Sequence, residues 1–130
     1  EEPEAVIDKI HAKGLKAGIA INPETPIERL FPYVSSVELI LMMTVNPGFA
    51  GQAFQWHVLE KLEGLNHYLE KQAVRPMIEV DGNIHSETAA AISKFGASVY
   101  VVGTSALFNT KPGTYREKVE KLKHSLTTFE

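Results

Sequence analysis

Hydrophobic residues along the chain fall into two patterns that alternate. Short apolar runs, typical of buried strands, recur four times, at residues 15–21, 37–45, 77–81 and 98–102. The segments between them place apolar residues every three or four positions, as on one face of a helix. The longest of these helical stripes is Phe54, Val58, Leu62, Leu65 and Leu69. This alternation predicts an α/β fold of parallel strands joined by right-handed crossovers.

Residues that begin and end helices mark the remaining segments. Residues 3–13 are expected to be helical, with a proline in the first turn and a glycine after the end. Residues 25–28 have the spacing of a capping box, which predicts a short helix that breaks or bends at Pro32. A helix is also expected over residues 86–95, and a second capping box at residues 114–117 opens the last helix. The apolar stripe of that last helix is Tyr115, Val119, Leu122 and Leu126.

Composition and charge exclude several classes of protein. The 130 residues suffice for one ordinary domain, and 44% of them are hydrophobic, as in a soluble globular protein. The net charge of −3 gives no basic surface for nucleic acid, no apolar run reaches the roughly 18 residues that span a bilayer, and the acidic N-terminus is unlike a signal peptide. Because there is no cysteine, disulfides and thiolate zinc sites are excluded, and we expect a cytoplasmic protein. Neither a G-x-G-x-x-G motif after the first strand nor a P-loop is present, so a dinucleotide site is unsupported.

Glycines and polar residues follow three of the predicted strands, at residues 48–51, 81–83 and 103–104. Because ligands of α/β proteins bind at the C-terminal ends of parallel strands, these turns are expected to form a site together. Glycines let backbone N–H groups approach an anion closely, and Asp81 adds a carboxylate beside it. On spacing alone, Asp81 is equally compatible with a helix cap. A simple tight turn is a second, less favoured interpretation of the 48–51 loop.

Several segments carry a resemblance to a known family. Residues 43–52 (MTVNPGFAGQ), 79–82 (EVDG) and 101–108 (VVGTSALF) closely resemble ribulose-phosphate 3-epimerases, and residues 22–26 (NPETP) are similar to their allulose-6-phosphate 3-epimerase relatives. The resemblance runs over essentially the whole chain. It implies that residues 1–130 are a single partial domain, the C-terminal half of a (β/α)8 TIM barrel with about four parallel strands alternating with helices. The N-terminal half of such a barrel would then be absent.

The resemblance implies an isomerase of carbohydrate metabolism, in the pentose phosphate pathway. The reaction would be metal-dependent epimerisation at C3 of a ketose phosphate, either ribulose 5-phosphate to xylulose 5-phosphate or allulose 6-phosphate to fructose 6-phosphate. Two aspartates would transfer protons through an enediolate, whose charge a divalent metal ion stabilises. The metal would be Zn, Fe, Mn, Co or Mg, since oxygen and imidazole sites accept several ions.

The same resemblance implies roles for particular residues. Asp81 would be both a metal ligand and one of the two acid/base aspartates. Met43 would face the reacting carbons as an apolar lid over the enediolate. The phosphate end would be lined by Gly48, Phe49, Ala50, Gly51, Gly82, Asn83, Gly103 and Thr104. Asn83 departs from the glycine usual in the family, although asparagine tolerates unusual backbone angles.

Residues that the chain lacks limit what it is expected to do alone. The family's histidine and aspartate ligands on earlier strands have no counterpart here, and one carboxylate does not make a metal site. The isolated chain is therefore expected to be inactive. Its two exposed sheet edges predict a partner, which would be the missing N-terminal half-barrel, another chain, or further copies in a homo-oligomer. The five histidines lack metal-ligand spacing, and the surface is the expected place for them.

Two other functions remain compatible with the same residues. One is a different phosphate-binding barrel enzyme, of the hexulose-phosphate synthase or decarboxylase type, which shares the late phosphate loops. The other is a non-catalytic half-barrel that only binds phosphate or a partner chain. For none of these functions do we expect nucleic acid or a membrane as a partner. For the epimerase, the expected substrate is a ketose phosphate.

Overall fold

A computed structural model describes residues 2–48 and 51–127 of the chain. In chain order the elements are α1 (Pro3–Ala12), β1 (Gly18–Ile21), η1 (Ile27–Tyr33), β2 (Leu39–Met43), α2 (Val58–Glu70), β3 (Met77–Asp81), α3 (Ser86–Ile92), η2 (Ser93–Phe95), β4 (Ala97–Val101) and α4 (Tyr115–Thr127), where η marks a 3₁₀ helix. The four strands form one sheet in the order β1-β2-β3-β4, and each pair of neighbours is parallel. This confirms the predicted α/β fold, and the arrangement is that of part of a TIM barrel.

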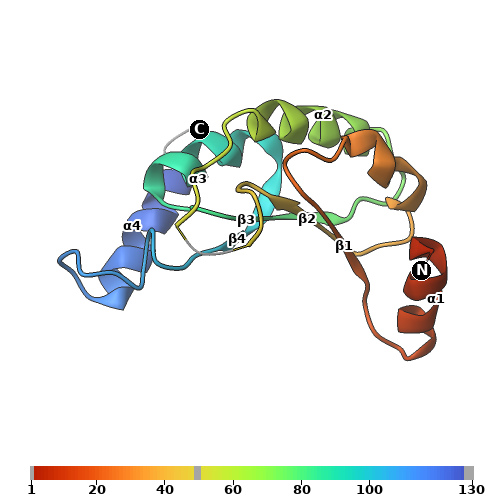
Figure 1. Cartoon of the computed structure of the whole chain (residues 1–130), viewed down its shortest axis with the longest axis horizontal. Helices are drawn as coiled ribbons and strands as arrows, with labels where there is room; N and C mark the ends of the chain where they lie inside the picture. Colours follow the sequence, from red (N-terminus) through yellow and green to blue (C-terminus); the bar gives the residue numbers. More distant parts are fainter. Residues whose placement is uncertain (1, 49–50, 128–130) are drawn as a thin grey trace.

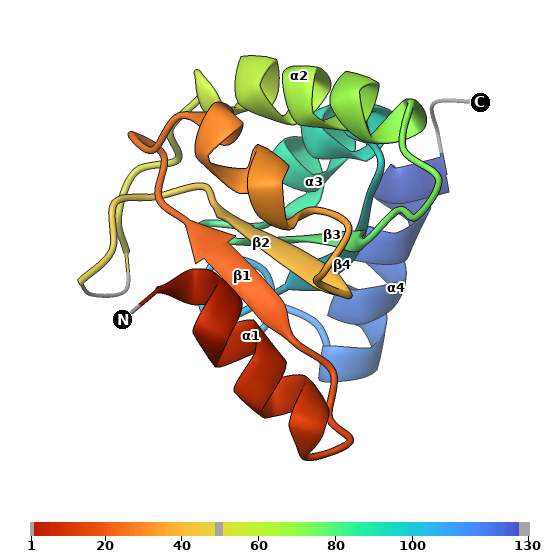
Figure 2. The same cartoon turned by 90° about the vertical axis from the view of Figure 1, so that its right-hand side faces the viewer.

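The chain folds into an arch (Figure 1). The sheet runs along the arch with α2 and α3 on its outer side, while α1 and α4 stand at opposite ends. The view turned by 90° shows α2 lying across the sheet with η1 beside it (Figure 2). None of the described helices is long and apolar enough to cross a membrane.

The core lies between the outer face of the sheet and α2. Residues of β2 and β3 alternate between the two faces, and those pointing outward are at most 1% exposed: Ile40, Met42, Ile78 and Val80. The predicted stripe of α2 belongs to the same core, with Val58, Leu62, Leu65 and Leu69 buried. Burying such a side chain stabilises the fold by about 1.5–3 kcal/mol. Phe54, the first residue of the stripe, precedes the helix but is also in the core.

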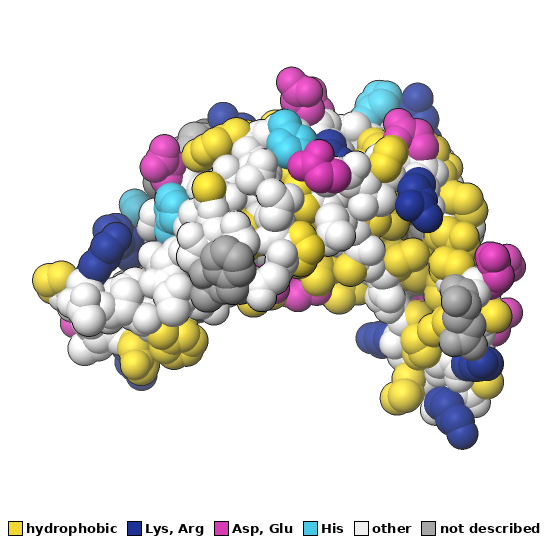
Figure 3. Space-filling model, in the orientation of Figure 1, with side chains coloured by type: hydrophobic (Ala, Val, Ile, Leu, Met, Phe, Trp, Pro, Cys, Tyr) yellow, Lys and Arg dark blue, Asp and Glu magenta, His cyan; other side chains and the backbone are white. Residues whose placement is uncertain are grey.

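The inner face of the sheet lines the hollow under the arch (Figure 3). Alternation places Leu41 and Met43 of β2 and Glu79 and Asp81 of β3 on this face, and all four are only partly buried. Each of the outermost strands, β1 and β4, pairs with one neighbour within the described residues. The two open edges predicted from the sequence are therefore present.

Strand pairing sets limits that differ from the apolar runs. β1 begins at Gly18 rather than at residue 15, and Leu15 is 63% exposed. β2 covers residues 39–43 of the predicted 37–45, because its register with β1 begins only where Gly18 meets Leu39. β3 has its predicted limits, and β4 begins and ends one residue earlier than predicted.

The capping box predicted at residues 25–28 is wrong. The helix there is the 3₁₀ helix η1, which begins at Ile27, and no side chain caps its first turn. Pro26 precedes it in an extended conformation, and the carbonyl of Thr25 accepts a hydrogen bond from Lys61. Pro32 lies inside η1 instead of ending it, and the segment runs on to Tyr33.

The helix ends predicted later in the chain are better matched. Thr114 Oγ1 accepts the N–H of Glu117 at 3.1 Å at the start of α4, and Gly96 adopts the left-handed conformation with a φ of 82° after η2. Tyr115 departs from the predicted stripe of α4 and is 61% exposed. Its ring contacts Phe108 edge-to-face instead of joining the core.

Candidate functional site

Three residues form a row across the inner face at the C-terminal ends of the strands. The parallel register pairs Met43 of β2 with Asp81 of β3, and Asp81 with Val101 of β4. Side chains at paired positions of neighbouring strands point to the same face of a sheet. Asp81 therefore stands between two apolar neighbours on the side that faces the hollow.

A pocket of 310 Å³ opens at this edge of the sheet and brings most of the predicted site residues together. Eight of the ten line it: Met43, Gly48, Gly51, Asp81, Gly82, Asn83, Gly103 and Thr104. The other two, Phe49 and Ala50, lie outside the described residues. The three turns thus meet as predicted, while the roles assigned to their residues stay predictions.

Thr44 joins the ends of β2 and β3. Its backbone N–H donates to the carbonyl of Asp81 at 3.0 Å, and its hydroxyl donates to the carbonyl of Gly82 at 2.5 Å. Its own carbonyl accepts the N–H of Gln55 at 2.8 Å, and the residue is fully buried. These bonds continue the pairing of β2 and β3 beyond the strands and set the point where both turns begin.

Gly82 and Asn83 shape the turn after β3. The φ of Gly82 is 131°, and a Cβ there would lie 2.7 Å from a methyl group of Val45 and 2.9 Å from Thr44 Oγ1. Asn83 has a φ of 54°, and its side-chain amide donates to the carbonyl of Gln52 at 3.3 Å. Asparagine therefore adopts the left-handed conformation here and also ties this turn to the loop before α2.

The turn after β4 is closed by its own backbone. The N–H groups of Leu107 and Phe108 donate to the carbonyl of Gly103 at 2.9 and 3.0 Å. A helical turn of this kind leaves the N–H groups at its start without a partner inside the turn. Gly103 and Thr104 stand at that start, are exposed and line the pocket. The start of the turn is therefore suited to an anion.

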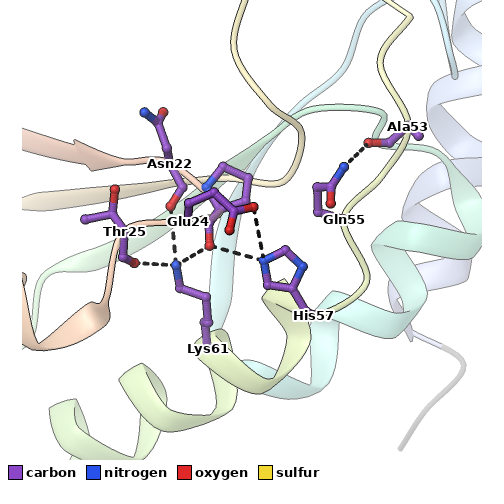
Figure 4. A network of polar contacts seen from close by, with 8 residues as sticks. Asn22, Glu24, Thr25, Ala53, Gln55, His57 and Lys61 are labelled. Atoms are coloured by element: carbon purple, nitrogen blue, oxygen red, sulfur yellow. Dashed lines mark hydrogen bonds and ion pairs between the residues drawn. The ribbon is translucent and has the colours of Figure 1, made fainter.

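A lysine of α2 holds the loop after β1 (Figure 4). Nζ of Lys61 donates to the carbonyls of Asn22 at 3.3 Å and Pro23 at 2.5 Å, and also to that of Thr25. Nε2 of His57 lies 3.2 Å from the same Pro23 carbonyl. Desolvation by partial burial lowers the pKa of Lys61. These contacts anchor the loop after β1 to α2, outside the lining of the pocket.

The described residues do not form a metal site. No group of three or more His, Asp or Glu side chains among them could hold an ion. Asp81 is the carboxylate in the described lining of the pocket, and Glu79 stands on the same face, two residues earlier in β3. A lone carboxylate is insufficient, because divalent ions take about four or more ligands. The implied role of Asp81 as a metal ligand therefore requires donors other than these residues.

Some residues that shape the pocket were not among those predicted. Gln52 and Ser105 line it, and each adjoins a predicted glycine turn, so their position in the sequence was the available signal. Thr44 had no such signal, because a threonine at the end of an apolar run is typical of any strand. Its bond to Gly82 joins residues 38 positions apart, and it follows from the pairing of β2 with β3.

Parallel strands with a pocket formed by the turns at their C-terminal ends are typical of α/β proteins, of which the barrels are one class. Within that class, residues 1–108 match the model of the ribulose-phosphate 3 epimerase family, and the chain belongs to this family. The resemblance seen in residues 43–52, 79–82 and 101–108 is thereby confirmed.

Individual relatives align over most of the chain. Ribulose-phosphate 3-epimerase of Schizosaccharomyces pombe is 35% identical over 126 residues, which cover 97% of this chain and 52% of that protein. The chloroplastic ribulose-5-phosphate-3-epimerase of Arabidopsis thaliana is 36% identical over 119 residues, 92% of this chain and 41% of that protein. The cytoplasmic isoform of Oryza sativa is 39% identical over 111 residues, 83% of this chain and 47% of that protein.

The chain spans about half the length of the curated relatives it matches. Their names place relatives in both the chloroplast and the cytoplasm, so membership of the family does not decide the compartment of this protein.

Proposed function

We propose that this chain is the phosphate-binding half of a ribulose-phosphate 3-epimerase, an isomerase that inverts C3 of ribulose 5-phosphate to give xylulose 5-phosphate. The observation that carries the proposal is the meeting of Asp81 with three glycine-bearing turns in one pocket. The family match and the names of the relatives support the reaction. Because the chain spans about half of those relatives, the complete reaction is proposed to need a second half-barrel.

Backbone N–H groups of the three turns would bind the phosphate. At Gly48, Gly51 and Gly103, nothing lies within 4 Å of the place that a Cβ would occupy. The positive φ angles of Gly48 and Gly51 (141° and 85°) account for glycine at those two positions. Gly103 has neither a positive φ nor a neighbouring atom that excludes a side chain. A phosphate that approaches the backbone closely would explain the glycine there.

Asp81 would move the proton at C3. Removing a proton next to a carbonyl requires a base within reach, and a carboxylate beside the bound sugar meets that need. Met43 and Val101 flank Asp81 and would keep water from the reacting carbons, with Met43 as the lid. Inverting a carbon centre requires a proton carrier on each side of it. Since Asp81 is the carboxylate in the described lining, the second carrier would come from the other half-barrel.

That second half-barrel would pair with β1 and β4 and cover the inner face of the sheet. Met77 and Val101 leave apolar surface there, since they are 54% and 37% exposed. The proposed partner is an N-terminal half-barrel of the family, on the same chain or another one, and the closed barrel could assemble further as a homo-oligomer. If a divalent metal is bound, Asp81 would share it with ligands of that partner.

Replacing Asp81 tests the proposed function. When this chain is joined to an N-terminal half-barrel of the family, Asp81→Asn should slow deuterium incorporation at C3 of ribulose 5-phosphate by about 10²–10⁴-fold. Glu79→Gln removes a carboxylate from the same strand and face, and it should keep the rate within about threefold. A rate for Asp81→Asn within that same range would contradict the proposal. Turnover by the isolated 130-residue chain would contradict the need for a second half.

A further inference from the structure

Side-chain hydrogen bonds connect α4 to the turn after β4. Nζ of Lys118 donates to Asn109 Oδ1 at 3.0 Å, to the Asn109 carbonyl at 3.2 Å and to the Leu107 carbonyl at 3.3 Å. These acceptors match the three N–H groups of an ammonium, so the hydrogen bonds of Lys118 are satisfied within the fold. The side-chain amide of Asn109 in turn donates to the carbonyl of Thr104 at 2.8 Å.

In the turn after β4, these hydrogen bonds hold backbone carbonyl groups. The Thr104 carbonyl is bound by Asn109, and the Gly103 carbonyl accepts the N–H groups of Leu107 and Phe108. In a helical turn, the carbonyl and N–H groups point in opposite directions along the axis. Each carbonyl shares a planar peptide unit with the N–H of the next residue. Holding the carbonyls of Gly103 and Thr104 therefore sets the direction of the N–H groups of Thr104 and Ser105, and both residues line the pocket.

We infer that Lys118 and Asn109 are positioning residues, which orient the N–H groups of Thr104 and Ser105 for binding a phosphate. This inference rests on the proposed function, since it concerns the same phosphate site. Neither residue is in the lining of the 310 Å³ pocket. Both instead line an adjoining hollow of 630 Å³, which shares Asn83 and Ser105 with the pocket. Lys118 and Asn109 thus act on the phosphate through the turn and not by touching it.

Lys121 provides a matched control for Lys118. It is on the same helix, lines the same hollow and carries the same charge, but it is exposed. Within the described residues, no hydrogen bond joins its ammonium to the turn after β4. Removing Lys121 therefore changes the local charge and leaves the bonds to Asn109 and Leu107 in place.

The test is a titration of the 130-residue chain with inorganic phosphate, monitored through the backbone amide signals of Thr104 and Ser105. Lys118→Met should raise the Kd for phosphate about tenfold, since hydrogen bonds to a charged group are lost. Lys121→Met should change it by no more than about twofold. Lys118→Arg keeps the charge and offers N–H donors, so it should restore most of the affinity.

Asn109→Asp tests the hydrogen bond from Asn109 to the Thr104 carbonyl, and it replaces Lys118→Met in the test if that variant fails to fold. It keeps the Oδ1 acceptor for Lys118 but loses the donor to Thr104, so it should also weaken phosphate binding about tenfold. Equal weakening by Lys118→Met and Lys121→Met would assign the effect to charge and overturn the inference. A lower Tm with unchanged phosphate Kd in both positioning variants would also overturn it. If the unaltered chain binds no phosphate, both this inference and the proposed phosphate site are contradicted.

Discussion

At the scale of single residues, the glycines around the pocket have different physical causes. Gly82 is required by the chain itself, because its φ is positive and a side chain would collide with Val45 and Thr44. Gly103 has space around it and an ordinary φ, so packing within the chain does not require it. A substitution should therefore affect folding at Gly82 and phosphate binding at Gly103.

The first prediction concerns Gly82. Gly82→Ala should lower the free energy of unfolding by about 2–5 kcal/mol, because backbone strain and overpacking add at this position. Gly113→Ala is the matched control, since the φ of Gly113 is 116° but the nearest atom to its Cβ position is 3.4 Å away. It should cost about 1–3 kcal/mol from strain alone. Equal losses for the two variants in urea unfolding would contradict the packing argument.

At the scale of elements, Glu38 joins three segments at the edge of the sheet opposite the pocket. It precedes β2, and its Oε1 accepts the N–H of Ala17, just before β1, at 2.6 Å. The same oxygen lies 3.0 Å from Nε2 of His11 in α1. The backbone bond from Ala17, followed by the bond from His11, lowers the pKa of Glu38 below its ordinary value of 4.5.

A dependence of stability on pH follows from this shift. Because the pKa is lower in the folded than in the unfolded chain, the contribution of Glu38 is present above pH 4.5 and is lost as pH falls through the folded-state value. Glu38→Gln keeps a side-chain oxygen but does not titrate in this range. As pH falls below 4.5, the free energy of unfolding should therefore fall less steeply in Glu38→Gln than in the unaltered chain. Parallel curves for the two proteins would contradict this prediction.

The elements that periodicity determines were predictable from the sequence. The limits of β3 and the buried stripe of α2 follow from which residues are apolar and how they are spaced. The start of η1 did not follow, because Pro26 and the bond from Lys61 to Thr25 replace the cap that residues 25–28 suggest. The start of β1 at Gly18 depends on its pairing with β2, which local sequence does not specify.

The candidate site was also predictable from the sequence only in part. The glycine turns could be recognised because their residues are unusual and follow apolar runs, and the alternation of elements implies that parallel strand ends meet. The bonds that hold the turns were not predictable, since Thr44 and Lys118 are ordinary residues of a strand end and a charged helix face. Their partners are determined by the packing of elements, and no local pattern marks them.

At the scale of the whole molecule, the two faces of the sheet differ in how far they are covered. The outer face is buried under α2, whereas the inner face and the edges at β1 and β4 are uncovered by the described residues. The site lies where the uncovered face meets the C-terminal strand ends. This position would let a second half-barrel complete the site as it covers the inner face, in agreement with a chain that spans about half of its relatives.

The most direct test of the central claim is a titration of the ¹⁵N-labelled chain with ribulose 5-phosphate, because the claim is that three separate turns bind one phosphate. The account predicts saturable shifts with one common Kd at the amides of Gly48, Gly51, Gly82, Gly103 and Thr104. Shifts confined to one turn, different Kd values for the turns, or shifts found only at residues of the adjoining 630 Å³ hollow would contradict it.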